Sequence, residues 1–407
     1  MRTFLTLLTL IILTVEISSQ WNLVTGTSGL EIRSIVISSN NIYVGTGGRG
    51  VFVSTNSGQT WRENAVAPSA IYVRDLAIDG NNLFAGTDGG VFISTDQGNT
   101  WTPKNTGITS LNILDIEVSG NNIFAVGDGG VYHSINSGNN WTQMNNGIDN
   151  STLKAVAIGS NIVYVGGGGG IYTSNNNGLS WNKINTYTLW GTWVNALTLD
   201  DNLLYAGTWQ KGIYVSNDSG TSWSAINSNM STTMIESIIP ISDNIFAATW
   251  GQGIYLSTNN GSSWNLINTG LPHNFFNSIA FSSTHIYCGS SAGFDGLMSR
   301  PLSELITGVE NSENENLPTA FYLHQNYPNP FNPNTVISYQ LPVGSNVSLK
   351  IYDMFGREVA TPLNEFRQAG THNLKLNIQN YSLSSGVYFY KLIAGGFSET
   401  KKMIYLK

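Results

Sequence analysis

The chain has 407 residues, a formal net charge of −7, and only 11% Asp, Glu, Lys and Arg. Its length allows two or three domains. The sparse charges form no basic run, which argues against a nucleic-acid-binding protein and against a segment that lies on a membrane. The 44 glycines, together with many Asn, Ser and Thr, favour short strands joined by tight turns. The single cysteine, Cys288, excludes an internal disulfide and is expected to be buried in its apolar run.

The N-terminal segment, residues 1–19, has the pattern of a secretory signal peptide. Arg2 supplies a positive charge, and the apolar run at 4–15 is too short to span a bilayer. Ser18 and Ser19 provide small residues for cleavage before Gln20. No cysteine follows, which argues against a lipid anchor, and no other run is long and apolar enough to cross a membrane. We therefore expect a soluble, exported protein.

One eight-residue pattern, STNSGQTW at 54–61, recurs along the chain. Its tryptophan returns at 61, 101, 141, 181, 223 and 264, so the period is close to 40 residues. A fixed period of this length indicates a repeat architecture. Each unit contains short apolar runs separated by Gly-rich turns, which is typical of a four-stranded propeller blade. The runs are almost continuously apolar, as expected for sheets packed on both faces.

A seventh unit lacks the pattern. Three apolar runs follow the sixth unit, but Arg300 and Pro301 come where the pattern should continue. The missing fourth strand is found at the other end of the chain, because Gln20–Leu23 resembles the segments that begin at Trp181 and Trp264. Trp21 also lies 40 residues before Trp61. The sequence therefore predicts seven blades, with the N-terminal strand closing the last one.

The repeated pattern itself has the features of a structural turn. Its third position is always Asn or Asp: Asn56, Asp96, Asn136, Asn176, Asp218 and Asn259. Its fifth position is always glycine: Gly58, Gly98, Gly138, Gly178, Gly220 and Gly261. We expect the Asn or Asp side chain to accept bonds from amides two residues on, the glycine to have positive φ, and the tryptophan to be buried. Asn in four of six copies argues against a catalytic carboxylate.

The pattern S-x-[DN]-x-G-x-[TS]-W resembles the Asp-box (BNR) repeat, and the resemblance covers residues 20 to about 304. Sialidases, xyloglucanases, sortilin-type receptors and the photosystem II assembly factor carry this repeat. The resemblance implies a seven-bladed β-propeller but no particular activity, because these families share a fold and differ in function.

Functional residues are expected on the face opposite the boxes, where the loops that enter each blade meet the turns between its second and third strands. Aromatic residues gather there in blades five to seven: Trp190, Trp193, Trp209, Trp250, Phe275, Phe276 and Phe294. The equivalent turns of blades two to four are TDGG, GDGG and GGGG, and carry no aromatic side chain.

A second group of candidates comes from the aligned starts of the first strands. These are Arg33, Arg74, Leu114, Lys154, Asn195, Glu236 and Asn277, which we expect to surround the channel mouth, with Arg49, Gln210, Lys211 and Gln252 as neighbours. Aromatic platforms beside polar groups suit a sugar ligand. In the alternative interpretation, the aromatic side chains pack under loops and the polar ring is a solvated channel entrance.

The main alternative to a non-catalytic binding module for glycan or protein is a sialidase- or xyloglucanase-like glycoside hydrolase. Such an enzyme needs two facing carboxylates. Glu236 is the one carboxylate in the ring and a weak catalytic candidate, while Asp75 and Asp115 are expected to point between blades. No cofactor is indicated, and the five scattered histidines predict no metal site. A purely structural surface protein is a third possibility.

The C-terminal part differs in composition and pattern. Residues 306–318 are polar and acidic, as in a linker, and alternating strands over 319–407 predict a small Ig- or fibronectin-like β-sandwich. Four stretches resemble the type A C-terminal sorting domain of the type IX (Por) secretion system of Bacteroidetes-like bacteria: 326–335, 350–359, 383–392 and 400–407. The resemblance implies passage through that machinery to the cell surface or medium, usually with cleavage of the domain. The predicted propeller spans residues 20–305.

Overall fold

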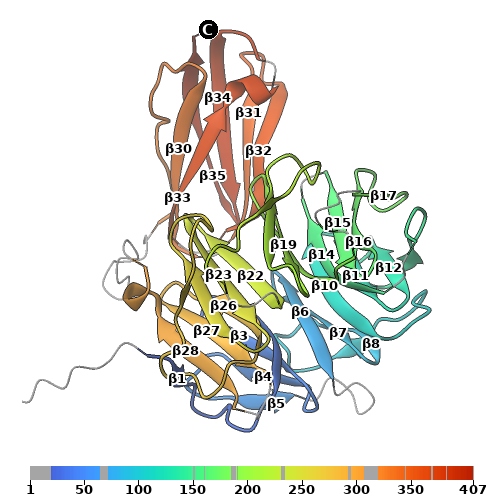
Figure 1. Ribbon diagram of the computed structural model, residues 1–407. Coiled ribbons are helices and arrows are strands. Elements are labelled where there is room, and N and C mark those ends of the chain that lie inside the picture. Colours follow the sequence, from blue (N-terminus) through green and yellow to red (C-terminus); the bar gives the residue numbers. More distant parts are fainter. Residues whose placement is uncertain are drawn as a thin grey trace, which may run out of the picture.

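The computed structural model describes residues 20–406 except 65–71, 150–151, 160, 185–188, 190, 231–233, 292–294, 307–319, 344, 368–369 and 382. The predicted signal peptide and nearly all of the predicted linker therefore lie outside the described residues. The rest of the chain forms a propeller and a second β domain with its own core (Figure 1). Among the described residues, no helix is long and apolar enough to cross a membrane.

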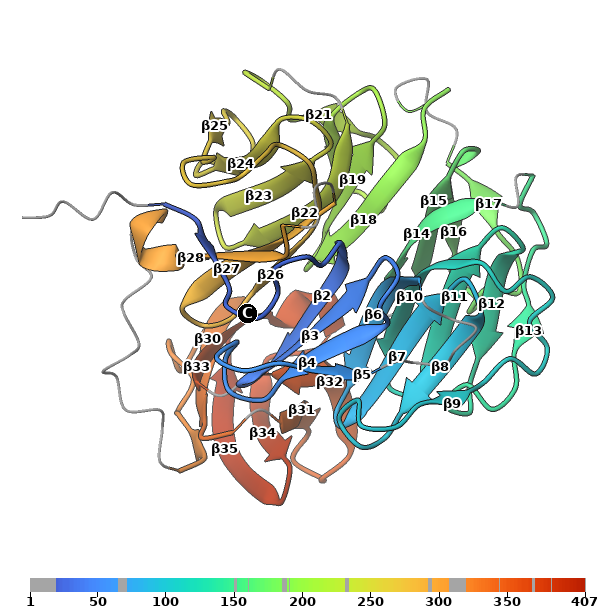
Figure 2. The ribbon, with the colours of Figure 1, turned by 90° about the horizontal axis from the view of Figure 1, so that it is seen from below.

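The described propeller residues form seven four-stranded antiparallel sheets around a common axis (Figure 2). The innermost strands are β2 (Ile32–Ser38), β6 (Val73–Asp79), β10 (Ile113–Ser119), β14 (Leu153–Ile158), β18 (Val194–Asp200), β22 (Ile235–Ile241) and β26 (Phe276–Phe281). The second strands are β3 (Asn41–Thr46), β7 (Asn82–Thr87), β11 (Asn122–Gly127), β15 (Val163–Gly167), β19 (Leu203–Thr208), β23 (Asn244–Thr249) and β27 (His285–Ser290).

The third strands are β4 (Val51–Ser54), β8 (Gly90–Ser94), β12 (Gly130–Ser134), β16 (Gly170–Ser174), β20 (Ile213–Ser216), β24 (Gly253–Ser257) and β28 (Leu297–Pro301), followed by the 3-10 helix η1 (Leu302–Glu304). The outer strands are β5 (Arg62–Asn64), β9 (Thr102–Pro103), β13 (Thr142–Gln143), β17 (Asn182–Lys183), β21 (Ser224–Ala225), β25 (Asn265–Leu266) and β1 (Asn22–Leu23).

The N-terminal strand closes the ring. Strand β1 pairs with β28, with Asn22 opposite Ser299, and so completes the seventh sheet. The amide of Trp21 donates to the carbonyl of Thr269 at 2.9 Å, and its indole Nε1 donates to the carbonyl of Ile267. The predicted seven blades and their closure by the N-terminal strand are confirmed.

Small residues in the second strands allow the blades to pack closely. A Cβ placed on Gly45 would lie 2.7 Å from Cγ1 of Val73 in the next blade, and one on Gly207 would lie 2.7 Å from Ile235. From its second residue onward, every position of β3 is buried. The almost continuous apolar runs therefore do belong to sheets that are covered on both faces.

The box turns are held by hydrogen bonds between their own residues. In the first box the hydroxyl of Ser54 donates to Oδ1 of Asn56 at 3.0 Å and accepts the amide of Gly58 at 2.8 Å. Oδ1 of Asn56 also accepts the amide of Thr60 at 2.9 Å. The predicted bond to an amide two residues on was therefore wrong. Ser57 and Gly58 both have positive φ, which folds the turn back and brings the amide four residues on to the Asn side chain.

The tryptophans of the boxes are less uniform than predicted. Trp141, Trp181, Trp223 and Trp264 are buried, as is Trp21 in the closing strand. Trp61 and Trp101 are only half-buried. The six box tryptophans and Trp21 therefore anchor the seven blades, but not all to the same depth.

The second domain is a sandwich of two antiparallel sheets. One contains β29 (Tyr322–Leu323), β30 (Asn334–Leu341) and β33 (Gly370–Asn377), and the other contains β32 (Glu358–Arg367), β31 (Ser345–Tyr352), β34 (Gly386–Ala394) and β35 (Phe397–Tyr405). A short 3-10 helix, η2 (Ile378–Tyr381), follows β33. Inward residues such as Leu349, Leu376 and Tyr390 form its core, so the predicted propeller followed by a β-sandwich is confirmed.

Candidate ligand-binding site

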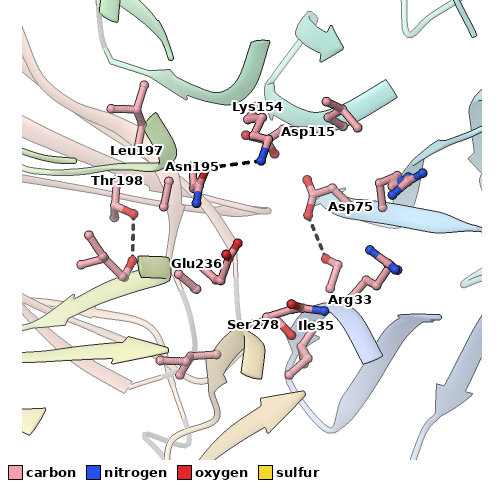
Figure 3. Close-up of a pocket in the computed structure, with 18 residues that line it drawn as sticks. Arg33, Ile35, Asp75, Asp115, Lys154, Asn195, Leu197, Thr198, Glu236 and Ser278 are labelled. Carbon is pink, nitrogen blue, oxygen red and sulfur yellow. Dashed lines mark hydrogen bonds between the residues drawn. The ribbon is translucent and has the colours of Figure 1, made fainter. Parts of the chain in front are cut away.

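A β-bulge places each predicted ring residue toward the axis. In all seven innermost strands the register with the second strand shifts at the ring position, as between Ile32 and Ser34 on either side of Arg33. A bulge leaves the extra residue outside the ladder and redirects its side chain. The ring residues Arg33, Arg74, Leu114, Lys154, Asn195, Glu236 and Asn277 all line one axial cavity of about 350 Å³ (Figure 3).

Behind the ring, acidic side chains connect neighbouring blades. Oδ1 of Asp75 accepts the hydroxyl of Ser34 at 2.8 Å, and Oδ2 accepts the amide of Ile116 at 3.2 Å. Oδ2 of Asp115 accepts the amide of Val156 at 2.7 Å. Both carboxyl groups thus lie in the cavity wall and bond to the adjacent blade, as the sequence predicted.

Burial controls the protonation of these acids. It raises the pKa of Asp75, although hydrogen bonds from Asp115 and Ser34 oppose the shift. Burial and the negative charge of Asp75 raise the pKa of Asp115 well above its ordinary value. The hydrogen bond between the two carboxyl groups favours a proton on Asp115, which donates it to Asp75. Further along β10, burial raises the pKa of Glu117 to about 8, against a hydrogen bond from the amide of Ile158.

A second cavity, of about 500 Å³, opens beside the ring in blade five. It is lined by Lys154, Gly191, Thr192, Trp193, Trp209 and Gln210, and we call it the Trp193–Trp209 groove. Both indoles are exposed, by 39% for Trp193 and 38% for Trp209, so neither is a core residue. The amide of Trp209 donates to the carbonyl of Trp193 at 2.9 Å, which fixes one backbone against the other.

Lys154 belongs to both cavities. Its Nζ lies 5.3 Å from the ring centre of Trp193 and 5.4 Å from that of Trp209, within cation–π range of both. It also lies 3.4 Å from Oδ1 of Asn195 (Figure 3). Burial raises the pKa of Glu236, and the positive charge of Lys154 opposes that shift. The groove and the axial cavity therefore share one charged wall.

The Trp193 indole explains why one turn is bare. A Cβ placed on Gly168, in the Gly-rich turn of blade four, would lie 2.9 Å from Cζ2 of Trp193. The glycine turn is thus the surface against which that indole lies, rather than an empty part of the face.

Gln210 has an unusual backbone for a residue with a side chain. Its φ is +151°, whereas the equivalent positions of blades one and six are Gly48 at +126° and Gly251 at +106°. This region is populated almost entirely by glycine, and strained residues of this kind gather at functional sites. Gln210 lines the Trp193–Trp209 groove.

Several candidates do not join these two cavities. Trp250 is 40% exposed and makes an edge contact with Phe275 at 5.5 Å, but lines neither cavity. Lys211 and Gln252 take part in backbone bonds of their turns and likewise line neither. Arg49 forms an ion pair with Glu63 of β5 and also lines neither cavity.

Phe276 is fully buried because it starts the apolar side of β26, so its expected place on the face was wrong. Trp190 and Phe294 lie outside the described residues.

The sequence interpretation missed Tyr72. Its ring is 38% exposed, and the guanidinium carbons of Arg33 and Arg74 each lie 5.9 Å from the ring centre. Tyr72 occupies the same position before the innermost strand as Trp193 does in blade five, so extending the aligned ring column two positions earlier would have found it. In the described part of the chain, no group of three His, Cys, Asp or Glu residues could hold a metal ion.

Two family models match parts of the chain. The DUF6242 β-propeller domain matches residues 16–153, and the secretion system C-terminal sorting domain matches residues 325–406. A search of curated proteins found no match.

Solved structures share the fold at low sequence identity. PorZ, a surface component of the type IX secretion system of Porphyromonas gingivalis, is 18% identical with a TM-score of 0.52; the match covers 93% of this chain but only 59% of PorZ. YCF48 from Cyanidioschyzon merolae is 17% identical with a TM-score of 0.53, over 71% of this chain and all of YCF48 (100%). A GH74 xyloglucanase from Xanthomonas campestris is 14% identical with a TM-score of 0.56, over 79% of this chain and 59% of the enzyme.

The sorting domain directs the protein through the type IX secretion machinery to the cell surface. The chain is thus a β-propeller protein, matched in its first part by the DUF6242 propeller family, that ends in a secretion system C-terminal sorting domain.

Proposed function

We propose that the propeller is a non-catalytic binding module for a glycan, which lies across the Trp193–Trp209 groove and reaches the axial cavity. The observation that carries this proposal is the pair of exposed indoles beside Lys154, in a groove of about 500 Å³ that adjoins a polar cavity. Ligand sites are concave and combine apolar walls with a few placed polar groups.

The chemistry of the two cavities suits a sugar. Indole faces offer apolar surface to the C–H face of a sugar ring, while Lys154, Asn195 and Glu236 offer donors and acceptors to its hydroxyl groups. Gln210 adds an amide at the groove wall, held by a strained backbone that a purely structural turn would fill with glycine.

The arrangement of the acids favours binding over hydrolysis. A glycosidase needs an acid and a second carboxylate free to act on opposite sides of the bond. Asp75 and Asp115 use their oxygens to accept Ser34 and the amides of the next blades. Glu236 is then the one ring carboxylate available to a ligand among the described residues, and it has no partner for glycosidase chemistry.

Both ligand classes are compatible with the fold. A propeller of this kind serves as a xyloglucanase in the GH74 enzyme, and YCF48 has been solved bound to D1 peptide. The exposed indole pair makes a glycan the preferred ligand here, and a peptide is the alternative outcome of the test below.

For the export route, we propose that residues 1–19 are removed after transfer to the periplasm and that residues 306–318 link the propeller to the sorting domain at 319–407. The propeller then acts outside the cell, where glycans are accessible. Mass spectrometry of the protein recovered from the culture medium would define both ends.

A glycan array probed with the purified protein tests the proposed function. We expect the wild type to bind at least one glycan, and Trp209→Ala to weaken that binding about tenfold, as loss of a central aromatic anchor does. Trp250→Ala is the matched variant, because Trp250 has the same exposure and turn position but lines neither cavity. We expect it to change affinity much less.

A second variant moves an indole without removing it. Gly168→Ala places a methyl group against Trp193, so we expect it to displace that ring and weaken binding while leaving the blade folded. Unchanged binding by both Trp209→Ala and Gly168→Ala, or capture of peptides alone by the wild type, would contradict a glycan site in this groove.

A further inference from the structure

Among the described residues of the propeller, one cation lacks a hydrogen-bond or ion-pair partner. Seven other cations make hydrogen bonds or ion pairs, and Lys211 also has an interaction: Arg33 with Glu31, Arg49 with Glu63, Arg62 with Asn99, Lys104 with Asn139, Lys154 with Asn195, Lys183 with Asp149, and Arg300 with Glu304. Within the same residues, no hydrogen bond or ion pair reaches Arg74, and its Nε is inaccessible to solvent. The guanidinium of Arg74 lies over the ring of Tyr72, 5.9 Å from the ring centre, within cation–π range.

Three of the four acids nearest the ring are already engaged. Glu31 pairs with Arg33 at 2.6 Å. Asp75 and Asp115 bond to each other and to donors of the adjacent blades. The fourth, Glu236, is affected by the positive charge of Lys154, which opposes the rise in its pKa. Among the described residues, the cavity therefore presents a guanidinium that no carboxylate pairs with.

A buried donor without a partner costs free energy, and in a native protein it calls for an explanation. Arg33 strengthens the case, because its Nε is also inaccessible and without a partner, and both arginines flank Tyr72 at the same distance of 5.9 Å. Two guanidinium groups beside one cavity form a site for a planar or tetrahedral oxyanion, which Arg binds through paired N–H donors.

We infer that the ligand is an acidic saccharide, and that its carboxylate or sulfate binds Arg74, assisted by Arg33, in the axial cavity while neutral rings lie in the Trp193–Trp209 groove. This inference rests on the proposed function and names the class of its ligand. It also explains why Arg74, which has no hydrogen-bond or ion-pair partner among the described residues, lines the axial cavity.

The test compares pairs of probes that share a sugar backbone and differ in charge. Oligogalacturonates and their methyl esters form one pair, and dextran sulfate and dextran form the other, so the two pairs distinguish a carboxylate from a sulfate. Calorimetric titration of the full chain should show the acidic member of at least one pair binding about tenfold more tightly, because a charge-assisted bond is gained. Added salt should reduce that preference.

Variants assign the preference to Arg74. Arg74→Gln should abolish it and leave the affinity for the neutral member within about twofold, and Arg74→Lys should retain part of it. Arg62→Gln is the matched control, because Arg62 bonds to a box residue and lines neither cavity. Its charge preference should equal that of the wild type. The urea midpoint of Arg74→Gln should be unchanged or higher, since no intramolecular ion pair is lost.

The outcomes separate this inference from the proposed function. Equal affinity for both members of each pair, or a charge preference that persists in Arg74→Gln, would overturn the acidic ligand; if the neutral member still binds and still depends on Trp209, the proposed function stands. Failure of every probe to bind would overturn the acidic ligand, whereas the glycan array decides the proposed function. A lowered urea midpoint in Arg74→Gln would assign Arg74 a structural role instead.

Discussion

The two edges of the propeller belong to the same seven blades, but one edge carries uniform residues and the other carries varied residues. At the box edge, six blades repeat one arrangement in which a Ser hydroxyl accepts the amide of the box glycine at 2.8–2.9 Å. At the opposite edge, seven equivalent bulges carry two Arg, one Leu, one Lys, two Asn and one Glu. Uniform residues indicate a structural requirement shared by every blade, whereas varied residues on equivalent backbone indicate a surface adapted to something else.

The acids of the two edges show the same contrast. At the box edge, hydrogen bonds from the side chain and amide of Thr100 lower the pKa of Asp96 to about 2, and Ser222 does the same for Asp218. On the innermost strands, burial raises the pKa of Asp75, Asp115 and Glu117. Box acids are stabilised in their charged form, while these buried acids are stabilised as neutral groups.

The largest expected effect is on the frame. Trp21→Ala removes the buried indole that closes the seventh blade and its bond to Ile267, so we expect the free energy of unfolding to fall by about 3–5 kcal/mol. Urea denaturation followed by circular dichroism measures this. Trp250→Ala, which truncates an exposed tryptophan, should cost less than about 1 kcal/mol. Equal losses in the free energy of unfolding would contradict the distinction between tryptophans that stabilise the blades and tryptophans exposed on the opposite face.

Much of the frame could be predicted because it repeats. The period of the boxes identified the blades, and the residues after Trp21 matched the strands after Trp181 and Trp264, which located the closure. The ring residues were found for the same reason, since one alignment column corresponds to one bulge in every blade.

The remainder of the site depends on contacts that repetition does not encode. Trp193 lies against Gly168 of the neighbouring blade, and Lys154 approaches two indoles of the next blade. Among the described residues, Nε of Arg74 has no hydrogen-bond partner in any blade. Trp250 has the same turn position as Trp209 and yet its ring contacts Phe275, because its bridge partner is Phe275 whereas that of Trp209 is Met234. Sequence position alone gave these two tryptophans the same role.

A smaller effect on stability is expected from Glu117 of β10. The pKa of Glu117 is about 8 in the folded protein, against an ordinary value of 4.5. Between these two values the folded state binds more protons than the unfolded state, so stability should fall as pH rises from about 4.5 to 8. Glu117→Gln should remove part of this dependence and raise stability at pH 8 by about 2 kcal/mol.

Denaturation midpoints of both proteins at pH 5 and pH 8 check the prediction for Glu117. Parallel pH dependences for wild type and Glu117→Gln would show that Glu117 is ionised in the folded protein. A box variant, Asp96→Asn, provides the comparison, because the lowered pKa of Asp96 leaves it ionised throughout this range and should add no slope there.

The smallest expected effect is a gain. Gln210→Gly should stabilise the protein by about 0.5 kcal/mol, because relief of the strained backbone outweighs the greater freedom of glycine in the unfolded chain. The same variant should weaken glycan binding through loss of the amide. Gln252→Gly, at a position of ordinary φ, should instead destabilise. Losses of stability in both variants would remove the argument that Gln210 is retained for the ligand.

The central claim is that the boxes stabilise the fold and that the opposite face binds the ligand. Hydrogen–deuterium exchange with and without the best glycan from the array tests this most directly, since it maps the ligand on the whole chain at once. The account predicts slower exchange at residues 191–195 and 208–212, and no change at the box turns 94–101 and 134–141. Protection of the box turns with none at residues 191–212 would contradict it.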